Sequence, residues 1–128
     1  MQLLLVGVSH RTAPVELRER LDFSARGVDR ALVALAGTPT HHEAIIVSTC
    51  NRVELYVGCD ETDAARTAIQ RFLSEFHGIP ADQLAPHVYA KTGHDAVQHL
   101  FRVAAGLDSL VIGEPQVLGQ VKDAFNLA

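Results

Sequence analysis

Residues 44–57, AIIVSTCNRVELYV, contain two runs of β-branched and apolar residues separated by the short polar segment STCNR. Two such runs around a short polar connection are typical of a β-hairpin. In the second run, apolar residues alternate with Glu54 and Tyr56, which predicts a strand with one buried face and one polar face. Cys59 falls on the buried face of this strand. The hairpin therefore places Cys50 near its tip.

The elements on either side of the hairpin complete the pattern of a small mixed domain. Leu and Val fill residues 2–8 almost continuously, as expected for a buried strand. Helical periodicity and capping residues predict helices at 14–19, 24–36, 62–77, 93–105 and from 113 onward. A short apolar run predicts one more strand at 87–90. The order strand, helix, hairpin, helix, strand predicts an α+β fold of the ferredoxin-like type, β-α-β-β-α-β. Helices would cover one face of an antiparallel sheet, and two further helices would follow at the C-terminal end.

Length, composition and charge restrict the class of protein. The chain has 128 residues, of which 48% are apolar and 20% charged, and this predicts one soluble globular domain over residues 1–128. Eleven basic and 15 acidic residues give a formal net charge of −4, so a nucleic-acid partner is expected to bind locally and not over a broad surface. The sequence shows no basic leader and no apolar run of membrane-spanning length, which predicts a cytoplasmic protein.

Cys50 and Arg52 are the first candidates for chemistry. An unpaired cysteine is usually buried as a small hydrophobic residue, so a thiol at a hairpin tip is either folded back into the core or used chemically. Arg52, two positions away, would favour the thiolate. Its planar guanidinium can also hold a carboxylate by two parallel hydrogen bonds, which favours an acidic substrate. Cys59 is the better candidate for an inert thiol.

His99 is the candidate acid or base. Apolar residues form one face of the helix expected at 93–105, and His99 is predicted to project roughly opposite that face. It would be either a solvent-facing histidine or a general acid or base in a cleft. The adjacent His41 and His42 lack a third ligand at a typical spacing, so no metal site is expected. No G-x-G-x-x-G or Walker sequence occurs, so this chain is expected to bring no cofactor of its own.

Three segments together resemble the N-terminal catalytic domain of glutamyl-tRNA reductase: GVSHRTAPVELRERL at 7–21, STCNRVELY at 48–56 and HLFRVAAGLDSLVIGEPQVLGQVKDAF at 99–125. The resemblance implies an enzyme of tetrapyrrole (haem) synthesis that converts glutamyl-tRNA to glutamate-1-semialdehyde with NADPH. It also implies that the NADPH-binding and dimerisation domains lie outside these 128 residues. The complete enzyme would be a homodimer that associates with glutamate-1-semialdehyde aminomutase. The chain alone is expected to lack reductase activity and to act at most as a slow esterase.

The resemblance also assigns roles to individual residues. Cys50 matches the nucleophile, whose thiolate would attack the aminoacyl ester and form a glutamyl thioester, and His99 matches the acid or base. Arg52 would bind the carboxylate of the glutamyl group. The further polar contacts implied around the substrate are Thr49, Ser109, Glu114, Gln116 and Gln120. For the two hydroxyl residues, simple hydrogen bonding within a turn is the alternative.

Two other functions remain compatible with the residues themselves. The first is a different cysteine enzyme, an acyltransferase or hydrolase that uses Cys50 and His99 on another acyl substrate. The second is a non-catalytic ferredoxin-like binding module in which the hairpin thiol is incidental.

Overall fold

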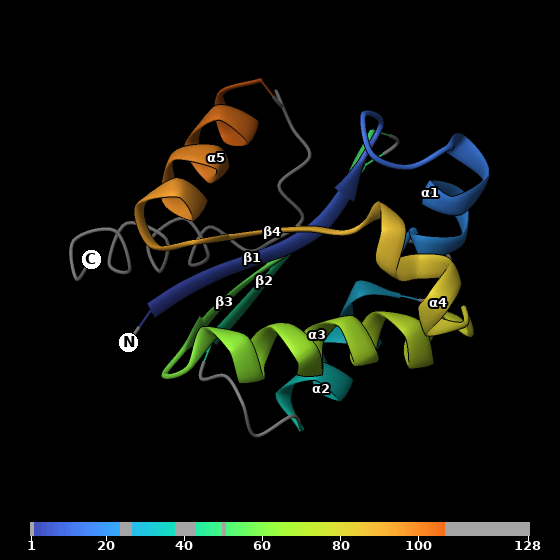
Figure 1. Ribbon diagram of the computed structural model, residues 1–128, viewed down its shortest axis with the longest axis horizontal. Coiled ribbons are helices and arrows are strands. Elements are labelled where there is room, and N and C mark those ends of the chain that lie inside the picture. Colours follow the sequence, from blue (N-terminus) through green and yellow to red (C-terminus); the bar gives the residue numbers. More distant parts are fainter. Residues whose placement is uncertain (1, 24–26, 38–42, 50, 107–128) are drawn as a thin grey trace.

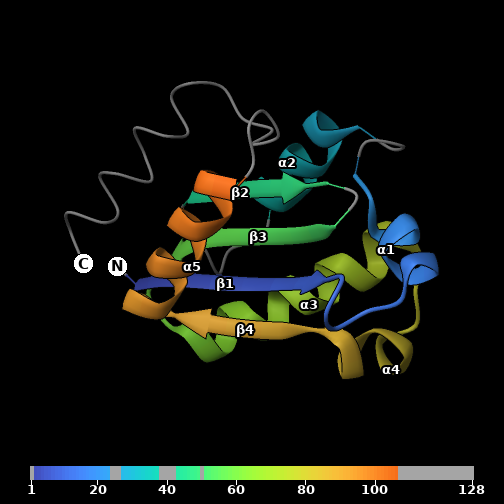
Figure 2. The same ribbon diagram turned by 90° about the horizontal axis from the view of Figure 1, so that it is seen from above.

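The computed structural model describes residues 2–23, 27–37, 43–49 and 51–106. Its elements are β1 (Gln2–Ser9), α1 (Val15–Leu21), α2 (Val28–Ala36), β2 (Glu43–Ser48), β3 (Arg52–Cys59), α3 (Thr62–His77), α4 (Ala81–Leu84), a 3-10 turn (Ala85–His87), β4 (Tyr89–Thr92) and α5 (Gly93–Gly106). The strands form one antiparallel sheet in the order β2-β3-β1-β4, as Figure 2 shows. The ferredoxin-like α+β fold predicted from the sequence is confirmed.

Helices cover both faces of the sheet. Helices α2 and α3 lie on one side and α5 lies on the other (Figure 1). Alternate residues of β1 serve two cores, because Leu4 and Val6 belong to the core shared with α1–α3 and Leu3 and Leu5 to the core under α5. This double coverage explains why the first strand is apolar at nearly every position.

Most element boundaries agree with the sequence prediction. Helix α3 spans the predicted residues 62–77, and it ends because Gly78 adopts the left-handed conformation (φ +66°) that glycine accepts without steric cost. Strand β4 begins two residues later than predicted, because residues 85–87 form a 3-10 turn. In α2, Ala31 and Leu35 are buried, whereas Leu32 is exposed. The helix expected from residue 113 lies outside the described residues.

Strand β3 differs from the prediction in one respect that matters for the site. The face that carries Glu54 and Tyr56 is buried, and these side chains are 0% and 1% exposed. The sequence predicted one buried face and one polar face for this strand, and in half-covered antiparallel sheets the polar face commonly meets solvent. Here the polar face is covered instead, because α5 packs over this side of the sheet. Cys59 lies on the opposite, apolar face and is fully buried, as predicted.

Candidate functional site

The strand register aligns side chains from three strands beneath α5. Glu54 on β3 pairs with Gly7 on β1, and Gly7 pairs with Tyr89 on β4. Residues that lie directly opposite in antiparallel strands share one face of the sheet. Glu54, Gly7 and Tyr89 therefore form a row across the sheet on the face that α5 covers.

Gly7 leaves the centre of this row open. A Cβ atom at this position would lie 2.8 Å from Cγ of Glu54 and 2.8 Å from the carbonyl oxygen of Val53, closer than such atoms normally approach. The hydroxyl of Tyr89 donates a hydrogen bond to Oε2 of Glu54 from the far side of Gly7. The missing side chain thus lets two residues on non-adjacent strands meet.

We expect Gly7→Ala to lower the free energy of unfolding by about 1–3 kcal/mol, the usual cost of overpacking a filled core. The added methyl group overlaps Glu54 and the β3 backbone, so one of them must shift. Urea unfolding of the purified chain measures the change. Gly37→Ala is the matched control, because a Cβ there meets only an atom at 3.5 Å and the backbone is already helical. Equal destabilisation by the two variants would contradict the steric argument.

The buried carboxylate of Glu54 is the centre of a polar network. Oε1 accepts a hydrogen bond from the hydroxyl of Tyr56 at 2.7 Å, and Oε2 accepts one from Tyr89. Oε2 also lies 2.6 Å from Nε2 of His99 and 3.5 Å from Nη1 of Arg52. Burial, reinforced by the charge of Glu54, raises the pKa of Tyr56 and Tyr89, so both phenols stay protonated and donate. Because all four neighbours are donors, Glu54 acts as a carboxylate.

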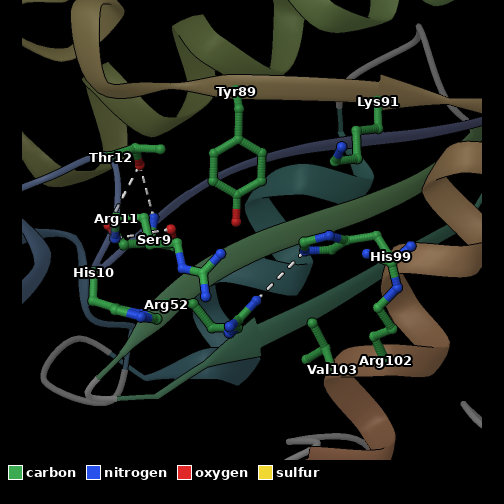
Figure 3. Close-up of a pocket in the computed structure, with 10 residues that line it drawn as sticks. All are labelled: Ser9, His10, Arg11, Thr12, Arg52, Tyr89, Lys91, His99, Arg102 and Val103. Carbon is green, nitrogen blue, oxygen red and sulfur yellow. Dashed lines mark hydrogen bonds between the residues drawn. The ribbon is translucent and has the colours of Figure 1, made fainter.

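His99 extends from α5 toward the sheet. The carboxylate of Glu54 can only accept hydrogen bonds, so its contact with Nε2 of His99 assigns a proton to Nε2. In neutral His99, Nδ1 is then the nitrogen that can accept a proton. Nη1 of Arg52 lies 3.4 Å from the same Nε2 (Figure 3). Since both nitrogens carry hydrogens, we interpret this approach as two donors drawn to one carboxylate oxygen. The ring of Tyr89 lies beside the imidazole, with centroids 5.9 Å apart.

The predicted orientation of His99 is therefore wrong. His99 was expected opposite the apolar face of its helix, yet it lies on the side that faces the sheet, next to the buried Ala96 and Leu100. Phe101, an apolar residue of the same helix, is 43% exposed. The helix is turned relative to the prediction, and this rotation brings His99 to Glu54.

Hydrogen bonds hold Thr49 and Asn51, which lie between β2 and β3 in the sequence. The hydroxyl of Thr49 accepts from the backbone N–H groups of Asn51 and Arg52 at 3.1 and 3.2 Å. The backbone N–H of His10 donates to the carbonyl of Asn51 at 2.8 Å, which ties the segment after β1 to this connection. Arg52 is thereby held at the start of β3. For Thr49, the described contacts are the turn hydrogen bonds that were the alternative to substrate binding.

A pocket of about 380 Å³ lies over the network, and Figure 3 shows the side chains around it. Its lining is polar and mostly basic: Ser9, His10, Arg11, Thr12, Arg52, Tyr89, Lys91, His99, Arg102 and Val103. Four of these side chains carry a permanent positive charge. The carboxylate of Glu54 is fully buried and is not part of the lining. The pocket is therefore suited to an anionic ligand.

Two of the residues singled out in the sequence, Arg52 and His99, meet in this pocket. Cys50, the predicted nucleophile, lies outside the described residues, as do the more C-terminal candidates and the histidine pair: Ser109, Glu114, Gln116, Gln120, His41 and His42. Within the described ranges, no group of three or more His, Cys, Asp or Glu side chains is arranged to hold a metal ion. None of the helices described is long and apolar enough to span a membrane.

Sequence reasoning missed the partners of Arg52 and His99. Arg52, Glu54 and Tyr56 occupy every second position of one strand, so their side chains share a face. That spacing was a usable signal, because Glu54 could have been paired with Arg52 from the sequence alone. Tyr89 gave no comparable signal, since its contact with Glu54 depends on how β4 adds to the sheet.

Comparison with known proteins shows which protein family the chain belongs to. A family described as "Glutamyl-tRNAGlu reductase, N-terminal domain" matches residues 6–128. This chain belongs to that family. The glutamyl-tRNA reductase of Syntrophotalea carbinolica is 50% identical over 128 residues, covering 100% of this chain and 29% of the relative. That of Brevibacillus brevis is 50% identical over 127 residues, covering 99% of this chain and 28% of the relative.

A solved structure leads to the same family. The glutamyl-tRNA reductase from Methanopyrus kandleri aligns with a TM-score of 0.56 at 31% sequence identity, covering 97% of this chain and 27% of that chain. The resemblance to glutamyl-tRNA reductase that three sequence segments suggested is confirmed at the level of the family. The chain spans less than a third of the length of these relatives.

Proposed function

We propose that this chain is the part of glutamyl-tRNA reductase that binds the glutamyl group and transfers it to Cys50. The observation that carries the proposal is the meeting of Arg52 and His99 in a basic pocket beside the β2–β3 connection. Family membership supports it, because the relatives are named for glutamyl-tRNA, whose glutamyl group carries the carboxylate that such a pocket suits.

In the proposed reaction, the Cys50 thiolate attacks the carbonyl carbon of the ester that joins glutamate to the tRNA. Nδ1 of His99 first takes the thiol proton of Cys50. A C–S bond then forms, the C–O bond to the terminal ribose breaks, and the ribose oxygen takes that proton from Nδ1. The product is a glutamyl thioester. Glu54 holds Nε2 of His99 in place, so the proton moves through Nδ1. A carboxylate that orients a catalytic imidazole in this way fixes both its tautomer and its direction.

Arg52 is the proposed clamp for the side-chain carboxylate of the substrate. Only Nη1 approaches Glu54, and a guanidinium has five N–H groups, so donors remain for a second carboxylate. The contact with Glu54 restrains the plane of the guanidinium before substrate arrives. This restraint lowers the cost of forming two parallel hydrogen bonds.

The complete enzyme would then reduce the thioester to glutamate-1-semialdehyde with NADPH, in the cytoplasm and in service of tetrapyrrole synthesis. NADPH would supply the hydride. This chain contains no G-x-G-x-x-G sequence, so we assign none of its residues to the dinucleotide. A homodimer and association with the aminomutase belong to the same proposal for the complete enzyme.

Mass spectrometry of the chain after incubation with glutamyl-tRNA tests the proposal. We expect a glutamyl adduct on the peptide that contains Cys50 and none after Cys50→Ser. Cys59 is an internal control, because burial and the neighbouring Asp60 raise the pKa of its thiol and it is inaccessible. An adduct formed only with unrelated acyl donors would indicate a different acyl-transfer enzyme. If no donor modified Cys50 and both thiols were alkylated equally fast, the chain would be a binding module.

A further inference from the structure

Three exposed basic side chains surround the mouth of the pocket, and we call them the cationic rim: Arg11, Lys91 and Arg102. They come from three different segments, two of which, β4 and α5, follow one another in the sequence. Arg11 follows β1, Lys91 lies on β4, and Arg102 lies on α5 one turn after His99. The chain as a whole has a formal charge of −4, so the rim is a local concentration of positive charge on an acidic protein.

No carboxylate in the described ranges neutralises the cationic rim. Among the described residues, none of its three members forms an ion pair with a carboxylate, whereas Arg52 pairs with Glu54. Glu54 itself is fully buried, already accepts hydrogen bonds from Tyr56, Tyr89 and His99, and pairs with Arg52. Uncompensated charges around a concave surface focus the electrostatic potential into it and attract anions.

Two members of the cationic rim sit on well-held backbone. In the segment after β1, the backbone N–H of Arg11 donates to the hydroxyl of Ser9 at 3.2 Å, and the hydroxyl of Thr12 accepts from the N–H of Ser9 at 3.0 Å. Lys91 is two residues from Tyr89 on β4 and pairs with Leu5 in the sheet, so it projects toward the α5 face. The backbone that carries these two charges is therefore held in place.

The glutamyl group alone does not account for so many cations. It brings one side-chain carboxylate, and Arg52 in the pocket provides a fork-shaped partner for it. The ester that Cys50 attacks in the proposed function joins this glutamyl group to a ribose, and phosphodiesters follow directly along the chain. Three further cations at the mouth of the same pocket match three further anionic groups on the same substrate.

We propose that the cationic rim is a phosphate subsite for the 3′-terminal nucleotides of the aminoacyl-tRNA, distinct from the carboxylate clamp at Arg52. This inference rests on the proposed function. It assigns the rim to backbone phosphates of single-stranded RNA, which carry no base-specific information. The rim thus sets the position of the ester without reading the identity of the tRNA.

Binding of a fluorescent tetraribonucleotide, 5′-ACCA-3′, to the 128-residue chain over a range of salt concentrations tests the proposal. The triple variant R11Q/K91Q/R102Q removes the rim, and R30Q/R66Q/R71Q removes three exposed arginines of α2 and α3 with the same change in charge. For single strands, log K falls with log salt, and each lost phosphate contact makes this slope shallower by about 0.7. We therefore expect the rim variant to lose about 2 units of slope and the control variant to keep the wild-type slope. Equal losses in both variants, or no loss in the rim variant, would overturn the proposal.

Two additional arms separate this inference from its alternatives. NADPH is added as a competitor, because its pyrophosphate could also bind the rim. If NADPH displaced the fluorescent tetranucleotide at a lower concentration than unlabelled tetranucleotide does, the assignment to RNA would be overturned. The Cys50 adduct is measured with glutamyl-tRNA on the same samples. Rim-dependent oligonucleotide binding without any adduct would support the RNA subsite and refute the acyl-transfer function. An adduct in the wild-type chain together with oligonucleotide binding that does not depend on the rim would support the acyl-transfer function and refute the RNA subsite.

Discussion

Glu54→Gln should slow thioester formation on Cys50 by roughly 10²- to 10⁴-fold, the range expected when a carboxylate that orients a catalytic histidine becomes an amide. The amide can keep an oxygen toward Tyr89 and His99 only if its NH₂ group faces Tyr56, whose hydroxyl can rotate to accept. The shape of the network is then nearly retained. What is lost is the negative charge that draws Arg52 and His99 to one oxygen.

The measurement is the rate of adduct formation at saturating and at low glutamyl-tRNA. As a positioning residue, Glu54 should affect the maximal rate more than the half-saturating concentration, because it acts through His99. Glu75→Gln is the matched control, since Glu75 is an exposed residue of α3 on the other side of the sheet. A maximal rate for Glu54→Gln within threefold of wild type would remove Glu54 from the mechanism.

Arg52→Lys should lower the second-order rate constant for adduct formation, measured at low glutamyl-tRNA, about 100-fold. Most of this loss should appear as weaker substrate binding. Lysine keeps the charge but cannot face Glu54 and a substrate carboxylate with separate, coplanar N–H groups. Losing one charge-assisted hydrogen bond costs roughly 2–3 kcal/mol, which corresponds to this factor.

The Arg52 experiment has a clear control. Arg66→Lys changes an exposed arginine of α3 and should leave both the rate and the half-saturating concentration unchanged. If Arg52→Lys raised the half-saturating concentration no more than Arg66→Lys, the carboxylate clamp would have to be sought elsewhere in the pocket.

Local signals in the sequence predicted the fold well. The hairpin is visible in its two β-rich runs, and the end of α3 is determined by Gly78. The start of β4 was misplaced because three residues before it form a 3-10 turn, which has no strong periodicity.

The site was only half predictable, for a physical reason. Arg52 and His99 were identified by residue type and resemblance, whereas Glu54 and Tyr56 were assigned to a polar face because such alternation usually marks solvent exposure. Nothing in the alternation itself shows that α5 returns over that face. The burial of Glu54 is a tertiary effect of the packing under α5, and so is the direction of His99.

The row of Glu54, Gly7 and Tyr89 has a consequence for inheritance. Its three residues sit side by side in space but are separated in the gene by most of the domain, because β1 lies between β3 and β4 in the sheet. A recombination event anywhere between codons 7 and 89 would bring together halves of the row from different ancestors. The glycine from one parent would then have to tolerate the glutamate or tyrosine of the other. A crossover between parents that differ at these three positions would therefore disturb the close packing that Gly7 permits.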